Sequence, residues 1–65
     1  MNIYTLTYKF NQFDTDYGVL IFTNRNEAKE MARYYRDTLF CFHVSLRHDK
    51  STHIGWCDII GFIEF

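Results

Sequence analysis

Residues 40–57, FCFHVSLRHDKSTHIGWC, contain both cysteines and all three histidines of this 65-residue chain. Thiolate and imidazole groups are the usual ligands of structural zinc sites, and a cysteine beside a histidine is also a pairing that thiol enzymes use. Structural zinc sites place two ligands close together, as Cys-x2-Cys or His-x3-His. Here the order is Cys-x-His-x4-His-x4-His-x3-Cys, which contains neither pair. The spacing therefore does not predict a metal site.

The same segment offers one arrangement that could support thiol chemistry. Cys41 and His43 are two residues apart on a predicted strand, so their side chains share a face and can meet. The chain has no glycine-rich phosphate loop, no nucleophile elbow and no pair of catalytic carboxylates. A chain of 65 residues also has little room for the pocket of about 300 Å³ or more that small-molecule sites need. We therefore predict a protein that is not an enzyme and uses no cofactor.

Alternating and helical patterns define the elements that position these side chains. The predicted strands are residues 3–10, 17–23, 40–48 and 53–65. Residues 24–39 carry an apolar stripe at helical spacing, with Asn24 as the N-cap and Glu27 placed to return the hydrogen bond. The order ββαββ predicts a single α+β domain, 1–65, in which one helix packs on one face of a four-stranded sheet.

This element order resembles that of β-grasp domains, such as immunoglobulin-binding modules. In that family the first and last strands pair in parallel at the centre of the sheet, and the apolar last strand suits a central place. The resemblance covers element order alone, and a fully antiparallel sheet is the alternative. Either sheet buries one face, which the alternation predicts to consist of Tyr4, Leu6, Tyr8, Phe10, Phe40, Phe42, Val44, Leu46 and the odd-numbered residues from Cys57 to Phe65. The helix covers this face with Ala28, Met31, Ala32, Tyr35 and Leu39.

A loop over residues 49–52 sets the pairing between the last two predicted strands. Residues that oppose each other across a hairpin share a face of the sheet. The predicted pairs are His48 with His53, Val44 with Cys57, His43 with Asp58, and Cys41 with Ile60. The cysteines then lie on opposite faces and form no disulfide, with Cys57 as a buried thiol. A register shifted by three residues, which reverses the pairing of faces, could place Cys41 across from Cys57, but it would bury Asp58 or expose the apolar face formed by Phe40, Phe42 and Val44.

The sheet face that the helix leaves uncovered is the first candidate binding surface. Trp56, Ile60 and Phe62 share the even-numbered face of the last predicted strand, together with Asp58. Contiguous exposed apolar side chains mark interaction sites, and tryptophan is enriched where binding energy concentrates. We predict that these four residues and His43 contact a protein partner, which is either a second copy of the chain or a different protein. The alternative is that a loop or the twist of the sheet covers them.

A second candidate surface is the flank of the helix. Arg25, Lys29, Arg33 and Arg36 fall in one narrow strip at about 100° per residue. This basic strip could meet phosphates or an acidic partner, and the alternative is an ordinary solvated face. The other flank carries Glu27, Glu30, Tyr34 and Asp37. Because the formal net charge is −1, the chain as a whole is not an electrostatic nucleic-acid binder.

Small size, the lack of catalytic motifs and these two surfaces predict a non-enzymatic protein-binding module. Proteins of this kind act as inhibitors, antitoxins or phage-type modulators that occupy a surface of a partner. The alternative function is nucleic-acid binding through the basic strip. We see no apolar run long enough for a membrane span and no export signal, so a cytoplasmic location with reduced thiols is expected.

Overall fold

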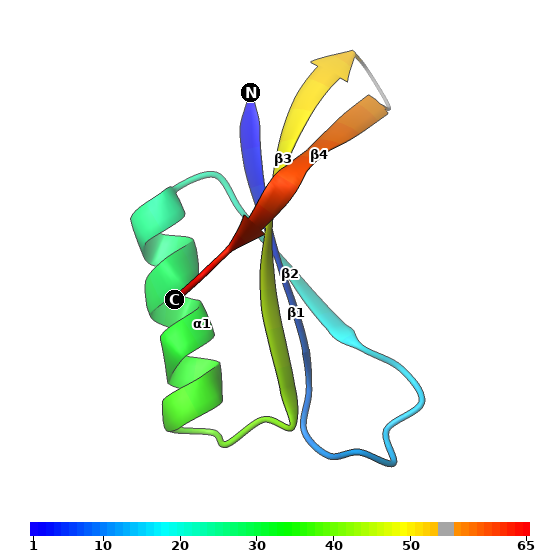
Figure 1. Cartoon of the computed structure of the whole chain (residues 1–65), viewed down its shortest axis with the longest axis vertical. Helices are drawn as coiled ribbons and strands as arrows, with labels where there is room; N and C mark the ends of the chain where they lie inside the picture. The colour runs from blue at the N-terminus through cyan, green and yellow to red at the C-terminus, as the bar shows by residue number, and fades with distance from the viewer. Residues whose placement is uncertain (54–55) are drawn as a thin grey trace.

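The computed structural model describes residues 1–53 and 56–65, with the side chains of residues 52, 53 and 56 excluded. Its elements are β1 (Asn2–Lys9), β2 (Gly18–Phe22), α1 (Arg25–Asp37), β3 (His43–His53) and β4 (Trp56–Ile63). Figure 1 shows α1 lying along one side of the twisted sheet. The predicted α+β class and the order ββαββ are therefore confirmed.

The four strands form one antiparallel sheet in the order β2-β1-β3-β4. The antiparallel alternative is thus the observed one, and the parallel pairing of first and last strands in β-grasp domains is not found. β1 instead pairs with β3 over eight residues, from Asn2 opposite Lys50 to Lys9 opposite His43. Because β3 has β1 on one side and β4 on the other, β4 is an edge strand. The expectation that its apolar sequence suits a central place is wrong.

The helix begins as predicted and ends earlier. Asn24 is the N-cap, and its Oδ1 accepts a hydrogen bond of 3.1 Å from the backbone N–H of Glu27. At the other end the N–H groups of Thr38 and Leu39 both donate to the Tyr34 carbonyl oxygen. The chain then turns at Phe40, whose φ of 52° lies in the left-handed region. Glycine usually occupies such a position after a helix, so an aromatic residue there carries backbone strain.

The core lies between α1 and one face of the sheet. Tyr4, Leu6 and Leu46 are buried against Ala28 and Ala32, whose small side chains let the helix approach the strands closely. Half-buried residues complete it, namely Tyr8, Leu20, Phe22, Met31, Tyr35, Val44, Ile63 and Phe65. The predicted buried face is confirmed at these positions. It is wrong for the residues that the structure leaves exposed, which are Phe10, Leu39, Phe40, Phe42, Cys57 and Ile59.

The register of the last hairpin differs from the prediction. β3 continues through residues 49–52, where a loop was predicted, because the backbone of Asp49 and Lys50 pairs with β1. His48 therefore lies opposite Gly61, and Asp49 lies opposite Ile59. The four predicted pairs are all wrong: His48 with His53, Val44 with Cys57, His43 with Asp58, and Cys41 with Ile60.

The pairing of β3 with β4 shifts register twice, between His48 and Asp49 and between Ser51 and His53, and the first shift is a β-bulge that decides which face the following residues occupy. His48 of β3 lies opposite Gly61 and the next residue, Asp49, lies opposite Ile59, so Ile60 is an extra residue on β4 that has no partner on β3. A bulge exchanges the faces on which the following side chains point. Cys57 and Ile59 consequently share the face of Ser51 and Asp49, away from α1, instead of joining the core.

Candidate functional site

The cysteines lie far apart and both are free. The backbone N–H of Cys41 donates to the Tyr35 carbonyl oxygen at the end of the helix, and partial burial raises the pKa of its thiol. Cys57 is exposed and lies opposite Ser51, near the other end of β3. The eight residue steps from His43 to Ser51 alone span about 25 Å. Cys57 is therefore not the buried thiol that the predicted register required.

The described histidines are part of the sheet and do not form a ligand cluster. His43 pairs with Lys9 of β1, and its ring meets the Tyr17 ring edge-on at 5.1 Å. The ring of His48 stacks on Tyr4 at 4.8 Å. The His53 side chain lies outside the described residues. Within the part of the chain that the structure describes, no three His, Cys, Asp or Glu side chains gather closely enough to hold a metal ion.

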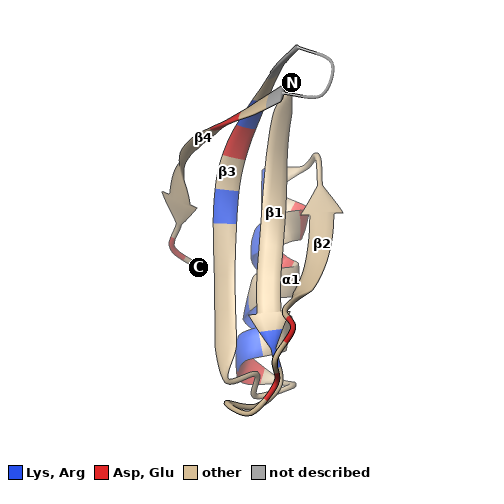
Figure 2. Cartoon of the chain, turned by 90° about the vertical axis from the view of Figure 1, so that its right-hand side faces the viewer, with Lys and Arg blue, Asp and Glu red and all other residues tan. Residues whose placement is uncertain are grey.

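The sheet face opposite α1 is uncovered, and we call it the open face. One cross-strand row runs through all four strands, from Ile21 through Thr5 and Arg47 to Phe62. Figure 2 looks onto this face, with α1 behind the sheet and β2 and β4 at its two edges. Both ends of the row are apolar and exposed, Ile21 by 63% and Phe62 by 75%. Val19 on β2 and Ile59 on β4 extend these two exposed apolar edges.

The centre of the open face is polar and held in place. Asp49 is 3% exposed. Its Oδ2 accepts a 3.2 Å hydrogen bond from the Thr5 hydroxyl, and the Nε atom of Arg47 lies 2.9 Å from Oδ1. Ile3 and Ile59 lie opposite Asp49 on the neighbouring strands. The result is a polar strip, joined by a hydrogen bond and an ion pair, between two apolar edges.

The structure retains part of the predicted binding face and changes the rest. Phe62 and His43 belong to the open face, and Ile60 is exposed at the bulge. Asp58 lies opposite Lys50, on the face that α1 covers further along the sheet, so the predicted pairing of His43 with Asp58 is wrong. The Trp56 side chain, central to the prediction, lies outside the described residues.

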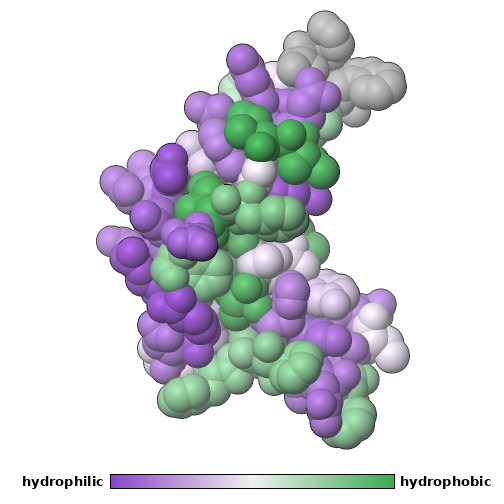
Figure 3. All heavy atoms as spheres, in the orientation of Figure 1, coloured by the Kyte–Doolittle hydropathy of each residue, from purple (hydrophilic) through white to green (hydrophobic). Residues whose placement is uncertain are grey.

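Sequence reasoning missed three exposed side chains of this face, namely Val19, Ile21 and Ile59. A signal for the first two was present, because residues 17–23 are apolar on both faces while the helix covers only one. Ile59 had no such signal, because the bulge at Ile60 decides its face. Figure 3 shows hydrophobic residues gathered over β4, beside a hydrophilic surface on the outer side of α1.

The predicted basic strip is partly neutralised. The guanidinium of Arg36 binds both carboxylate oxygens of Asp37, donates to the Phe65 backbone oxygen and lies 5.0 Å from the Phe65 ring centre. This hydrogen bonding holds the pKa of the Asp37 carboxyl below its usual range. Asp37 was predicted on the opposite flank. Arg25 and Arg33 are exposed and Lys29 is half-buried, so three cations of the strip are left for a partner.

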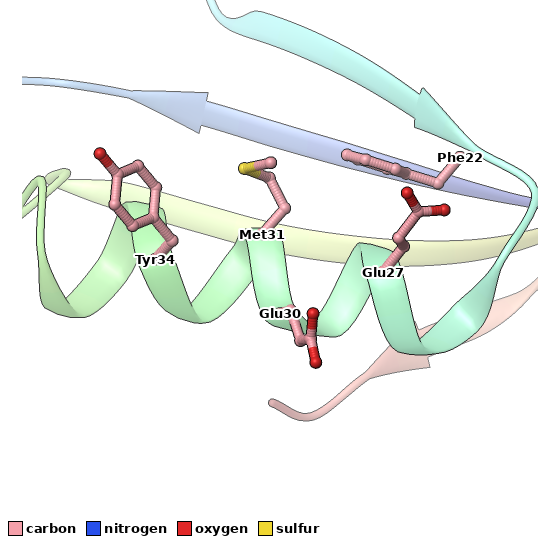
Figure 4. Close-up of a pocket in the computed structure, with 5 residues that line it drawn as sticks. All are labelled: Phe22, Glu27, Glu30, Met31 and Tyr34. Carbon is pink, nitrogen blue, oxygen red and sulfur yellow. The ribbon is translucent and has the colours of Figure 1, made fainter.

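The acidic flank of α1 borders a groove of about 450 Å³ that is open to solvent. It is lined by Phe22, Glu27, Glu30, Met31 and Tyr34. In Figure 4, Glu27, Met31 and Tyr34 reach from the helix toward β2, the Phe22 ring lies beside Glu27, and Glu30 is on the neighbouring flank. The expectation that so short a chain has little room for a hollow of about 300 Å³ or more is wrong. The lining holds no cysteine, serine or histidine that could act as a nucleophile or be paired with a base.

No protein-family model matches this chain, and neither the curated proteins nor the solved structures returned a match. Functional inference therefore depends on the residues themselves. In the described ranges, 1–53 and 56–65, no helix has the length and apolar character needed to cross a bilayer.

Proposed function

We propose that this chain is a non-catalytic protein-binding module that acts through its open face. The observation that carries the proposal is the pair of exposed apolar edges on that face, formed by Val19 and Ile21 on β2 and by Ile59 and Phe62 on β4. Within each edge the exposed apolar side chains are neighbours, and exposed apolar patches are characteristic of interaction sites.

The small core supports the same conclusion. Five apolar residues are buried, whereas thirteen large hydrophobic residues are exposed in the described part of the chain. The accessible surface of the chain is 4787 Å². A compact monomer of 7.9 kDa is expected to expose about 4,400 Å². The chain therefore exposes roughly 400 Å² more than a compact monomer of its mass.

A second copy of the chain fits the open face. Ile21 and Phe62 end the same cross-strand row on opposite edges of the sheet. A two-fold axis that runs along the strands between β1 and β3 places each β2 edge over the β4 edge of the other copy. Ile21 of each copy then packs on Phe62 of the other copy. Arg47 of each copy faces Thr5 of the other copy instead of another arginine. The face is therefore self-complementary, as a two-fold interface requires.

The nucleic-acid alternative has less support. Arg36 is already engaged by Asp37 and Phe65, so the strip offers Arg25, Lys29 and Arg33. Three cations make a small phosphate footprint. If the strip bound nucleic acid, the double reversal Lys29→Glu/Arg33→Glu would abolish binding, and the affinity would fall steeply with salt.

The proposal is tested by measuring the molar mass of the protein in solution. Light scattering after gel filtration is expected to give a dimer for the wild type at about 100 µM and a folded monomer for Phe62→Glu, because the new charge would be buried in the interface. Phe13→Glu is the matched control, since Phe13 is 82% exposed in the β1–β2 loop, away from the open face. It should remain dimeric. A wild type that stays monomeric, or equal effects of both variants, would contradict pairing through this face.

A further inference from the structure

The two edge strands of the sheet differ in how they are protected. β4 carries the bulge at Ile60 and the charge of Asp58, two devices that discourage another strand from pairing with an edge. β2 has neither. Its sequence, GVLIF, contains no charge and no proline, and its register with β1 is unbroken over five pairs. β2 is therefore a regular edge that a further strand can extend.

The groove of about 450 Å³ lies beside this same edge. Phe22 contributes to it from β2, and Met31 and Tyr34 contribute from α1. Side chains of a strand alternate between the two faces of a sheet. A strand added to β2 would therefore direct every second side chain into the groove, and the others to the open face beside Val19 and Ile21.

Charge defines what the groove can accept. Glu27 and Glu30 line it, and among the described residues neither carboxylate has an ion-pair partner. Lysine and arginine can lay their aliphatic stems on an apolar surface and present their charge at its rim. On the opposite side of the added strand, the exposed Val19 and Ile21 favour β-branched apolar neighbours.

We propose that the β2 edge and the adjoining groove bind an extended peptide segment in which basic residues alternate with β-branched apolar residues. Backbone hydrogen bonds to β2 provide affinity. The basic side chains enter the groove toward Glu27 and Glu30, and the apolar side chains continue the row of Val19 and Ile21. The groove lies on the α1 side of the sheet and takes no part in the contact between β2 and β4 edges proposed above, whereas Val19 and Ile21 belong to both surfaces.

A second copy of the chain does not fit this site. Antiparallel pairing of two β2 strands about a two-fold axis would place both helices on the same side of one continuous sheet. Glu27 and Glu30 of the two copies would then face each other across the axis, and such like charges repel. A basic segment of another protein removes this repulsion.

The test uses the whole protein and a fluorescein-labelled, capped octapeptide of alternating lysine and valine, with fluorescence anisotropy as the readout. The peptide is expected to bind at least tenfold more tightly than its glutamate–valine counterpart. Glu27→Gln/Glu30→Gln should weaken binding of the lysine–valine peptide about tenfold. Glu64→Gln removes an exposed carboxylate elsewhere and should leave the affinity unchanged.

Backbone methylation tests whether the peptide binds as a strand. All residues on one face of an added strand direct their N–H groups to the same side. Two peptides are compared, one N-methylated at every lysine and the other at every valine. One of them should lose binding, and the other should keep the affinity of the unmodified peptide. Equal binding of the two methylated peptides, no binding at 1 mM of the unmodified peptide, or an affinity unaffected by Glu27→Gln/Glu30→Gln would overturn the proposal.

Discussion

The ion pair at the centre of the open face should respond asymmetrically to loss of its two members. The side chain of Asp49 is 4% exposed, whereas that of Arg47 is 39% exposed. Removing the arginine, as in Arg47→Met, leaves a buried carboxylate whose remaining described partner is the Thr5 hydroxyl. Removing the carboxylate, as in Asp49→Val, leaves an arginine that can turn into solvent.

The two costs follow from this difference in burial. Breaking a fully buried ion pair by deleting one partner destabilises by about 3–5 kcal/mol. The partial exposure of Arg47 lets some water reach the carboxylate and lowers the figure for Arg47→Met to roughly 2–3 kcal/mol. Asp49→Val loses a charge-assisted hydrogen bond but places an apolar side chain between Ile3 and Ile59, so its net cost should be about 1 kcal/mol. The double variant should resemble Asp49→Val within about 0.5 kcal/mol, because no charge is then left buried.

Urea unfolding of the wild type, the two single variants and the double variant at neutral pH measures all four free energies. Arg47→Met should be the least stable of the four. If Asp49→Val proved the more destabilising single change, or if the two effects simply added in the double variant, the asymmetric burial would not control this site.

Three further changes probe other parts of the fold. Gly18→Ala would direct a methyl group into the Tyr8 ring and should lower the free energy of unfolding by about 1–3 kcal/mol. In a Tyr8→Leu background, where the ring is absent, the same change should lower the free energy of unfolding by less than about 0.5 kcal/mol. Phe40→Gly should be more stable than Phe40→Val by at least about 1 kcal/mol in urea unfolding, because the φ of residue 40 is 52°, and equal stabilities would refute strain there. Burial raises the pKa of Cys41, and burial followed by the neighbouring Tyr8 raises the pKa of Tyr35, so the folded state holds both protons more tightly. The stability that this provides is complete while the pH is below the pKa values of the two groups in the unfolded chain, and it is lost as the pH rises through their higher pKa values in the folded chain. A Tyr35→Phe/Cys41→Ala variant whose urea midpoint fell as steeply with pH as that of the wild type would contradict this.

Local patterns in the sequence determined the elements and the core. The alternation in residues 3–10 buries Tyr4 and Leu6, and the helical stripe buries Ala28 and Ala32. Asn24 determined where the helix begins, because a cap depends only on neighbours within one turn. The presence of a single helix also implied that one face of the sheet is left open. None of these features requires knowledge of which strands are neighbours.

Strand order and register depended on the tertiary structure. The side-chain period of a strand is two, so the change from His48 opposite His53 to His48 opposite Gly61, a shift of eight residues, keeps every side chain on its face. The hydrophobic pattern cannot distinguish the two registers. The ladder between β1 and β3 decides, because it holds Asp49 and Lys50 in a strand that continues to His53. The bulge at Ile60 then reverses the faces of Cys57 and Ile59, and the position of α1 beside β2 forms the groove. These features arise from contacts between residues distant in sequence, which no local pattern records.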